Sequence, residues 1–215
     1  MQPDQVPMPP AIAARPRDPR GYPVLAITPW RDGAPDFAVT SPARILVCAV
    51  ERRCSICGLA LGTGPFWRVV AADEAVAIAT QPAAFDNTAS TVEPPGHRLC
   101  MLYAAVVCPW LARPNARRRL DVEAVGLHVS RGETRGAVGE TGGAVVAFES
   151  YEFAVGERVE FRYRGLAAFL PHLLGEEHLA ELRDAAAREP DPDEPCPPWL
   201  LADEATAQER AERYR

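Results

Sequence analysis

The sequence lacks lysine entirely, so all 23 of its basic residues are arginine. Several kinds of catalytic site depend on a lysine amine. Among them are the phosphate-binding loop of P-loop nucleoside triphosphatases, the Schiff base of pyridoxal enzymes and the lysine nucleophile of ligases. We therefore exclude these three activities from the outset.

Long hydrophobic runs and a positive charge balance are also lacking. No apolar run approaches the length needed to span a bilayer, and the polar, proline-rich start differs from a signal peptide. The net charge of -6 disfavours wholesale binding to nucleic acid or membranes, since both usually require a basic surface. We expect a cytoplasmic protein that makes no membrane contact.

The distribution of proline suggests three regions along the 215 residues. Residues 1–20 contain prolines at six positions and are predicted to form a flexible arm. Residues 21–188 are long enough to bury one core and are predicted to form a single α+β domain around a small, mostly antiparallel sheet. Residues 189–215 are predicted to be a proline-rich, acidic linker that leads into a charged terminal helix.

Local patterns predict a mixed fold within the central region. Ser41 and Pro42 are typical of an N-cap and a first helical position, so a helix is expected to follow them. Residues 71–92 lack a firm periodicity and are expected to be mostly loop with some helical turns. The other expected elements are a loose hairpin over 22–40, a helix over 97–108, strands over 65–70, 117–129, 143–155 and 158–164, and a helical stripe over 170–186.

Two residue pairs have the spacing of metal ligands. Cys54 and Cys57 form a Cys-x-x-Cys loop, and Gly58 after them can adopt the positive φ of a zinc knuckle. His97 and Cys100 are three residues apart on the first turn of the expected helix, so they share one face. Zinc favours four such sulfur and nitrogen ligands in a tetrahedron, and we predict that these residues bind Zn²⁺.

The predicted zinc is structural, because four protein ligands leave no position for a reacting water. Binding at such a site contributes about 10–16 kcal/mol in zinc-finger peptides, which rivals the stability of a whole domain. The alternative is that the four residues are unrelated, with Cys54 and Cys57 acting as redox thiols or lying inert at the surface. The remaining cysteines, Cys48, Cys108 and Cys196, are expected to be free thiols.

The predicted order of elements resembles a treble-clef zinc module: a knuckle, a strand, a loop and then a helix that carries the last two ligands. The segments "RGYP", "CSICG", "PPGHRLC" and "CPWL", in this order, resemble an uncharacterised family of bacterial and phage proteins over roughly residues 20–170. The resemblance implies the same four metal ligands and gives Cys108 a motif position of unknown role. It implies no reaction.

The sequence leaves the function open among three hypotheses. The leading one is a zinc-binding accessory or interaction protein with an unknown protein partner. The second is a small-molecule enzyme with a pocket between the zinc helix and the sheet, for which Tyr103, His128 and His172 are the acid–base candidates. The third is a nucleic-acid module that uses a basic cluster, Arg117, Arg118 and Arg119. Because the chain as a whole is acidic, we favour the alternative that these arginines are simply solvent-exposed near the C-terminus of a helix.

Overall fold

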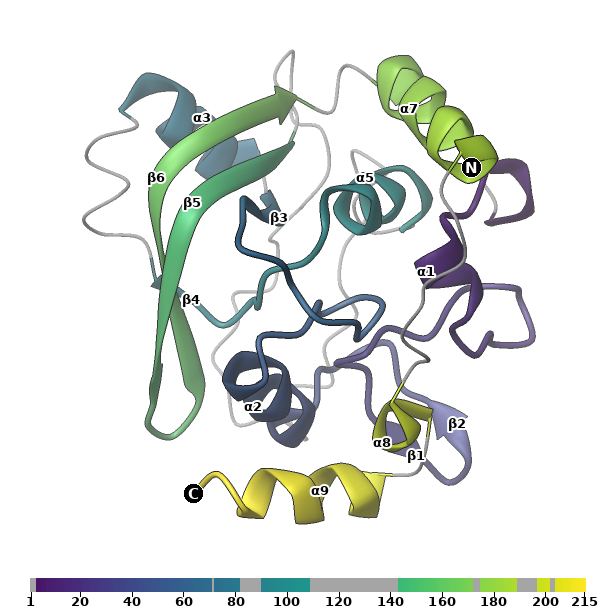
Figure 1. The fold of residues 1–215 in the computed structure, drawn as a ribbon, viewed down its shortest axis with the longest axis vertical. Coiled ribbons are helices and arrows are strands. Elements are labelled where there is room, and N and C mark those ends of the chain that lie inside the picture. The colour runs from purple at the N-terminus through teal and green to yellow at the C-terminus, as the bar shows by residue number, and fades with distance from the viewer. Residues whose placement is uncertain are drawn as a thin grey trace.

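The structure is a computed structural model and is mixed α+β, as the sequence predicts (Figure 1). It describes residues 3–70, 72–81, 90–108, 143–171, 175–188, 197–201 and 204–215. The expected strand over 117–129, the glycine-rich segment after it and the proline-rich linker over 189–196 lie outside these ranges. None of the described helices is long and apolar enough to cross a membrane.

The main sheet has four antiparallel strands in the order β3-β5-β6-β4, and its β5-β6 hairpin lies along one side of the molecule (Figure 1). Its strands are β3 (Phe66–Val70), β4 (Ser90–Thr91), β5 (Ala144–Val155) and β6 (Val159–Pro171). In β6, Val159, Phe161 and Tyr163 are buried and alternate with more exposed polar residues, as the pattern predicts. The mostly antiparallel sheet expected from the sequence is thereby confirmed.

Both faces of the sheet are buried where β3 pairs with the first residues of β5. Alternate residues of β5 enter two cores: Val146 and Phe148 join one, whereas Val145 and Ala147 join the other. The first core contains α2 (Pro42–Val50) and the second contains α5 (Arg98–Val107) with α7 (Gly175–Arg188). Strands buried on both faces have continuous apolar runs, which explains the sequence "AVVAF" at the start of β5.

Two local predictions are confirmed in the segment of the chain that precedes Cys54. The expected hairpin is β1 (Trp30–Arg31) with β2 (Ala34–Pro35), and its Asp32-Gly33 turn has positive φ at both positions, as a type I′ turn requires. Helix α2 begins at Pro42, where the Ser41 side chain caps it by accepting a hydrogen bond from the Arg44 amide.

The N-terminal segment differs from the flexible arm that its prolines suggested. It contains η1 (Pro3–Gln5) and α1 (Pro10–Ala13), and Ile12 is fully buried in the second core. The Arg15 guanidinium donates to the Val24 carbonyl at 2.8 Å. The prolines restrict the unfolded chain, so ordering this segment costs less entropy than its composition suggests. That residues 21–188 form a single domain remains a prediction.

Residues 72–80 are more regular than the predicted loop with some helical turns, whereas residues 71 and 82–89 lie outside the described ranges. Residues Ala72–Thr80 form helix α3, which buries Ala75 and Ile78 against the first core. Glu74 pairs at 2.6 Å with the buried guanidinium of Arg68 on β3. The apolar stripe is built largely from alanine, so the periodicity of the sequence gave little indication of this helix.

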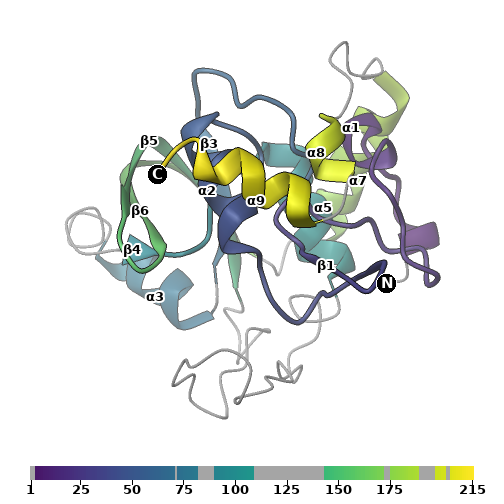
Figure 2. The same cartoon turned by 90° about the horizontal axis from the view of Figure 1, so that it is seen from below.

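The C-terminal segment packs on the body of the protein. Its helices are α8 (Pro198–Leu201) and α9 (Glu204–Glu212), and α9 lies against α2 (Figure 2). The fully buried Arg44 of α2 pairs with Glu204 at 2.9 Å, and the Ser41 hydroxyl donates to the same carboxylate. The Leu200 carbonyl accepts from Arg15 at 3.2 Å. The predicted terminal helix is therefore present and anchored by buried arginines.

Replacing Glu204 by alanine should destabilise the protein, because the buried Arg44 guanidinium would lose its carboxylate. Breaking a buried ion pair costs about 3–5 kcal/mol. Since 33% of the Glu204 side chain is exposed, we expect a loss of about 2 kcal/mol in the free energy of unfolding, measured with urea. Glu209→Ala, on an exposed position of the same helix, should change it by less than about 0.5 kcal/mol. Equal effects of the two variants would contradict the anchoring role.

Candidate metal centre

The Cys-x-x-Cys loop is a tight reverse turn closed by backbone hydrogen bonds. Arg53 and Ala60 form an isolated antiparallel bridge, and inside it the Cys54 amide donates to the Leu59 carbonyl at 2.9 Å. The Gly58 amide donates to the Cys54 carbonyl at 2.9 Å, and Gly58 has the positive φ of 81° that the sequence analysis expected. This turn brings both cysteine side chains to the same side.

The second pair is positioned by the sheet and by the start of a helix. Gly96 and Trp67 of β3 exchange two backbone hydrogen bonds, at 2.8 and 3.1 Å, which fixes the chain just before His97. His97 is the N-cap of α5, and Cys100 follows in the first turn, as predicted. The Ser55 amide donates to the Pro95 carbonyl at 3.0 Å, so the two loops are also joined directly.

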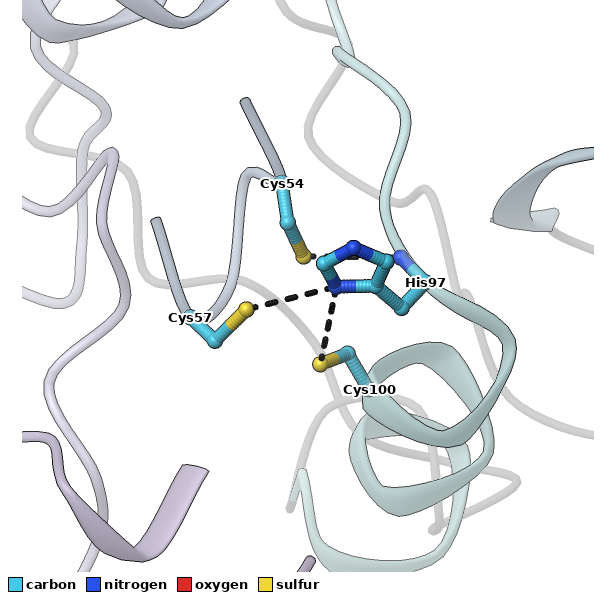
Figure 3. A group of neighbouring side chains, drawn as sticks. All are labelled: Cys54, Cys57, His97 and Cys100. Atoms are coloured by element: carbon cyan, nitrogen blue, oxygen red, sulfur yellow. Dashed lines mark hydrogen bonds between the residues drawn. The ribbon is translucent and has the colours of Figure 1, made fainter. Parts of the chain in front are cut away.

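The four predicted ligands meet at one point (Figure 3). Their donor atoms all lie within 4.8 Å of one another, and the three cysteines are at most 1% exposed. The Nδ1 atom of His97 lies 3.4 Å from the Cys57 sulfur and 4.0 Å from the Cys100 sulfur. Cys54 accepts a hydrogen bond from the His97 amide at 3.5 Å. Three sulfurs and one imidazole in this arrangement could hold a metal ion.

A backbone carbonyl fixes the orientation of the imidazole. The other ring nitrogen of His97, Nε2, lies 3.0 Å from the Ala60 carbonyl oxygen, which can only accept a hydrogen bond. Nε2 therefore carries a proton, and Nδ1 is the nitrogen that faces the sulfurs. Partners of this kind set the tautomer and the ring orientation of metal-binding histidines. The sequence pattern could not identify Ala60, because any residue provides a carbonyl.

When no ion is bound, hydrogen bonds among the four side chains shift their pKa values in different directions. Burial raises the pKa of Cys54, but hydrogen bonds from Cys100, Cys57 and His97 outweigh it and hold that pKa well below its usual value. Burial lowers the pKa of His97, but hydrogen bonds to Cys54 and Cys57 raise it to about 11. The pKa of Cys100 is raised well above its usual value by its hydrogen bonds to Cys54 and Cys57 and by burial.

The pKa of Cys57 follows the same distribution of charge. A hydrogen bond from Cys100 lowers this pKa, but the interaction with Cys54 and burial outweigh that effect and raise it. In the metal-free cluster the pKa of Cys54 is therefore lowered, whereas the pKa values of His97, Cys57 and Cys100 are raised, which keeps these last three groups protonated at neutral pH. An incoming ion must displace protons from these three groups.

The knuckle is covered by the C-terminal segment, a contact that the sequence did not indicate. A Cβ atom added at Gly58 would overlap the Leu200 side chain of α8 and lie 3.5 Å from Ala26. A Cβ added at Gly96 would lie 3.0 Å from the Cys54 sulfur. The two glycines beside the metal-ligand residues thus allow close packing that a larger residue would prevent.

The catalytic candidates do not join this cluster in the described structure. Tyr103 is buried on α5, its hydroxyl has no hydrogen-bond partner among the described residues, and burial raises its pKa to about 12. Cys108 is half-buried at the C-cap of α5 and is not part of the metal-ligand group. His128, His172 and the cluster at 117–119 lie outside the described residues.

A second layer of side chains supports the helix that carries His97 and Cys100. Arg98 lies 5.0 Å from the centre of the Trp67 ring and pairs with Glu181 of α7 at 2.7 Å. The adjacent His178 is buried, and desolvation lowers its pKa despite the nearby Glu181. These contacts tie α5 to both β3 and α7, so the metal-ligand residues rest on packed elements.

Comparison of the chain with protein-family models, with characterised proteins and with solved structures finds no match. The assignment of this site therefore rests on its own geometry and chemistry.

Binding of a divalent transition metal should release protons. At pH 7 each of His97, Cys57 and Cys100 loses a proton when the ion binds, because their pKa values lie above 7. Affinity should therefore rise as the pH rises toward neutrality and fall in acid. Titrating the metal-free protein with Co²⁺ in weakly buffered solution containing a pH indicator measures the release. Binding without acidification would contradict this proton distribution.

Gly58→Ala should weaken both folding and metal retention. The left-handed backbone costs an alanine about 1 kcal/mol, and overlap with Leu200 adds about 1–3 kcal/mol. Leu200→Ala should cost less in the Gly58→Ala background than in the parent, since it removes the overlap. Urea unfolding and the rate of metal loss to a chelator measure these effects.

Gly62→Ala is the matched control for that double-mutant cycle. It lies in the same loop, and an added Cβ there meets no atom within 4 Å. We expect it to leave stability and metal retention nearly unchanged. Additive effects of the Gly58 and Leu200 substitutions would show that the C-terminal segment does not press on the knuckle.

Proposed function

We propose that the ion is Zn²⁺ and that the protein is a zinc-stabilised accessory or interaction protein of the cytoplasm. The donor set supports this metal: three cysteine sulfurs with one imidazole nitrogen are a common ligand set of structural zinc. Soft thiolate donors disfavour magnesium, calcium and manganese, which prefer oxygen. Cysteines held as thiols also suit a reducing compartment.

The observation that carries the proposal is the convergence of four donor atoms from two loops, three on buried cysteines and one on the half-buried His97. Four protein ligands complete a tetrahedron, whereas catalytic zinc sites usually keep one position for water. The cysteines are almost fully buried, and Leu200 and Ala26 lie against Gly58 of the knuckle. A zinc ion here would join the knuckle to α5 and so to the sheet.

The order of the elements is compatible with the treble-clef description, and we adopt it as part of the proposal. The knuckle precedes β3, and the last two ligands come at the start of α5. The role as an interaction protein is supported by the placement of Tyr103, the one described catalytic candidate, in the core with a buried hydroxyl. The proposal therefore assigns no reaction.

Elemental analysis and native mass spectrometry of the purified protein should find one tightly held zinc per chain. Cys54→Ser and His97→Ala should each lose most of the metal, and removal of zinc with a strong chelator should unfold the protein, since binding and folding are coupled. Circular dichroism measured alongside the metal content follows both events.

Cys108→Ser provides the matched control, because this thiol lies on the same helix outside the ligand group. It should keep the full zinc content. Ligand variants that stay folded and hold as much metal as the parent would overturn the site. Iron in place of zinc, or a loosely held ion whose removal leaves the fold intact, would overturn the structural role.

A further inference from the structure

The outer half of strand β5 has an open edge. On one side β5 pairs with β6 along its whole length, but on the other side β3 pairs only with Ala144–Phe148. Across the described ranges, no strand pairs with this side of β5 beyond Phe148. In Figure 1 the β5-β6 hairpin extends well past β3. Alternate backbone groups along residues 150–155 therefore have no strand partner on this side within the described ranges.

This open edge has an apolar face and a charged face. Tyr151, Phe153 and Val155 are on one face, opposite Tyr163, Phe161 and Val159 of β6. Phe153 is 38% exposed and Val155 is 54% exposed, although the Phe153 ring also packs against Phe161 at 6.2 Å. On the other face, Glu152 lies 3.7 Å from Arg164. Long edge strands with exposed apolar residues readily pair with other chains.

We propose that this edge binds a second copy of the same chain, with the two β5 strands antiparallel and Phe153 opposite Phe153 of the second copy. A two-fold axis makes such an interface self-complementary. Tyr151 of each copy then faces Val155 of the other, so an apolar residue faces an apolar residue at every odd-numbered position. Glu152 faces Ala154, which keeps the two carboxylates apart.

Other registers of the same pairing are less favourable. A register centred on Glu152 places two carboxylates directly opposite each other, and like charges in that position are destabilising. Shifting one strand by a single residue moves the apolar face of one copy beside the charged face of the other. A register centred on Ala154 pairs Glu152 with Gly156, at the turn, and shortens the contact. The register centred on Phe153 avoids all three problems.

The chain before β3 limits the length of this pairing, because Gly64 lies close to the Glu149 carbonyl. The pairing covers residues 151–155 of each copy and stops before the turn at 156–158. In this register Phe148 of the second copy faces Arg158, where the first hairpin has already turned. The β3 strand of the second copy therefore passes beyond the tip of the hairpin, and the two sheets join into one continuous sheet.

The oligomeric state of the full chain tests the proposal. Sedimentation equilibrium of the parent should give a concentration-dependent rise toward twice the chain mass of 23.4 kDa. F153E and F153R should each remain monomeric, because each places two like charges at the centre of the interface. An equimolar mixture of the two variants should recover the dimer, since the central pair is then of opposite charge.

Val76→Glu is the matched control, because Val76 is a similarly exposed apolar residue on α3 (42%). It should dimerise as the parent does. A parent that is monomeric at all concentrations, a dimer that survives F153E, or a mixture that fails to recover it would overturn the proposal. Although the inference supplies a partner for the proposed interaction role, it does not depend on the metal. Zinc content, measured on the same samples, separates the two proposals.

Discussion

Four donor atoms from two loops must lie close together, and much of the surrounding structure holds these two loops in place. Cys57 and His97 are 40 residues apart, yet their side chains lie 3.4 Å from each other. Gly96 is paired to β3 on one side of the cluster, and the knuckle is closed on itself on the other. Like-charged thiolates so close together repel unless protons or a cation neutralise them, so the local fold and the ion-binding chemistry depend on each other.

Buried arginines form the second organising feature of a chain without lysine. Arg15, Arg44 and Arg68 are each at most 3% exposed, and each guanidinium donates to a backbone carbonyl or pairs with a carboxylate. Arg44 bonds to Glu204 and to the carbonyls of Ala26 and Leu200, which joins α2 to the C-terminal segment. A planar guanidinium offers several fixed donors, so it can satisfy such sets of acceptors better than an ammonium group.

Local patterns predicted much of the framework and all four residues of the candidate metal site. The Ser41-Pro42 cap, the alternation in β6 and the apolar start of β5 are signals within a few residues of each other, and each is present in the structure. Long-range effects were missed. Helix α3 depends on Arg68 and the sheet for its burial, and the N-terminal segment depends on the core that receives Ile12.

The sequence by itself determined which four residues are the candidate metal ligands, because ligand spacing within a turn or a helix is a local property. Only the tertiary structure decided what surrounds them: the Ala60 carbonyl that orients His97, the Leu200 side chain against Gly58, and the edge of β5 that β3 leaves uncovered. These contacts join segments far apart in the chain. They depend on how helices and strands pack together, which no short window of sequence encodes.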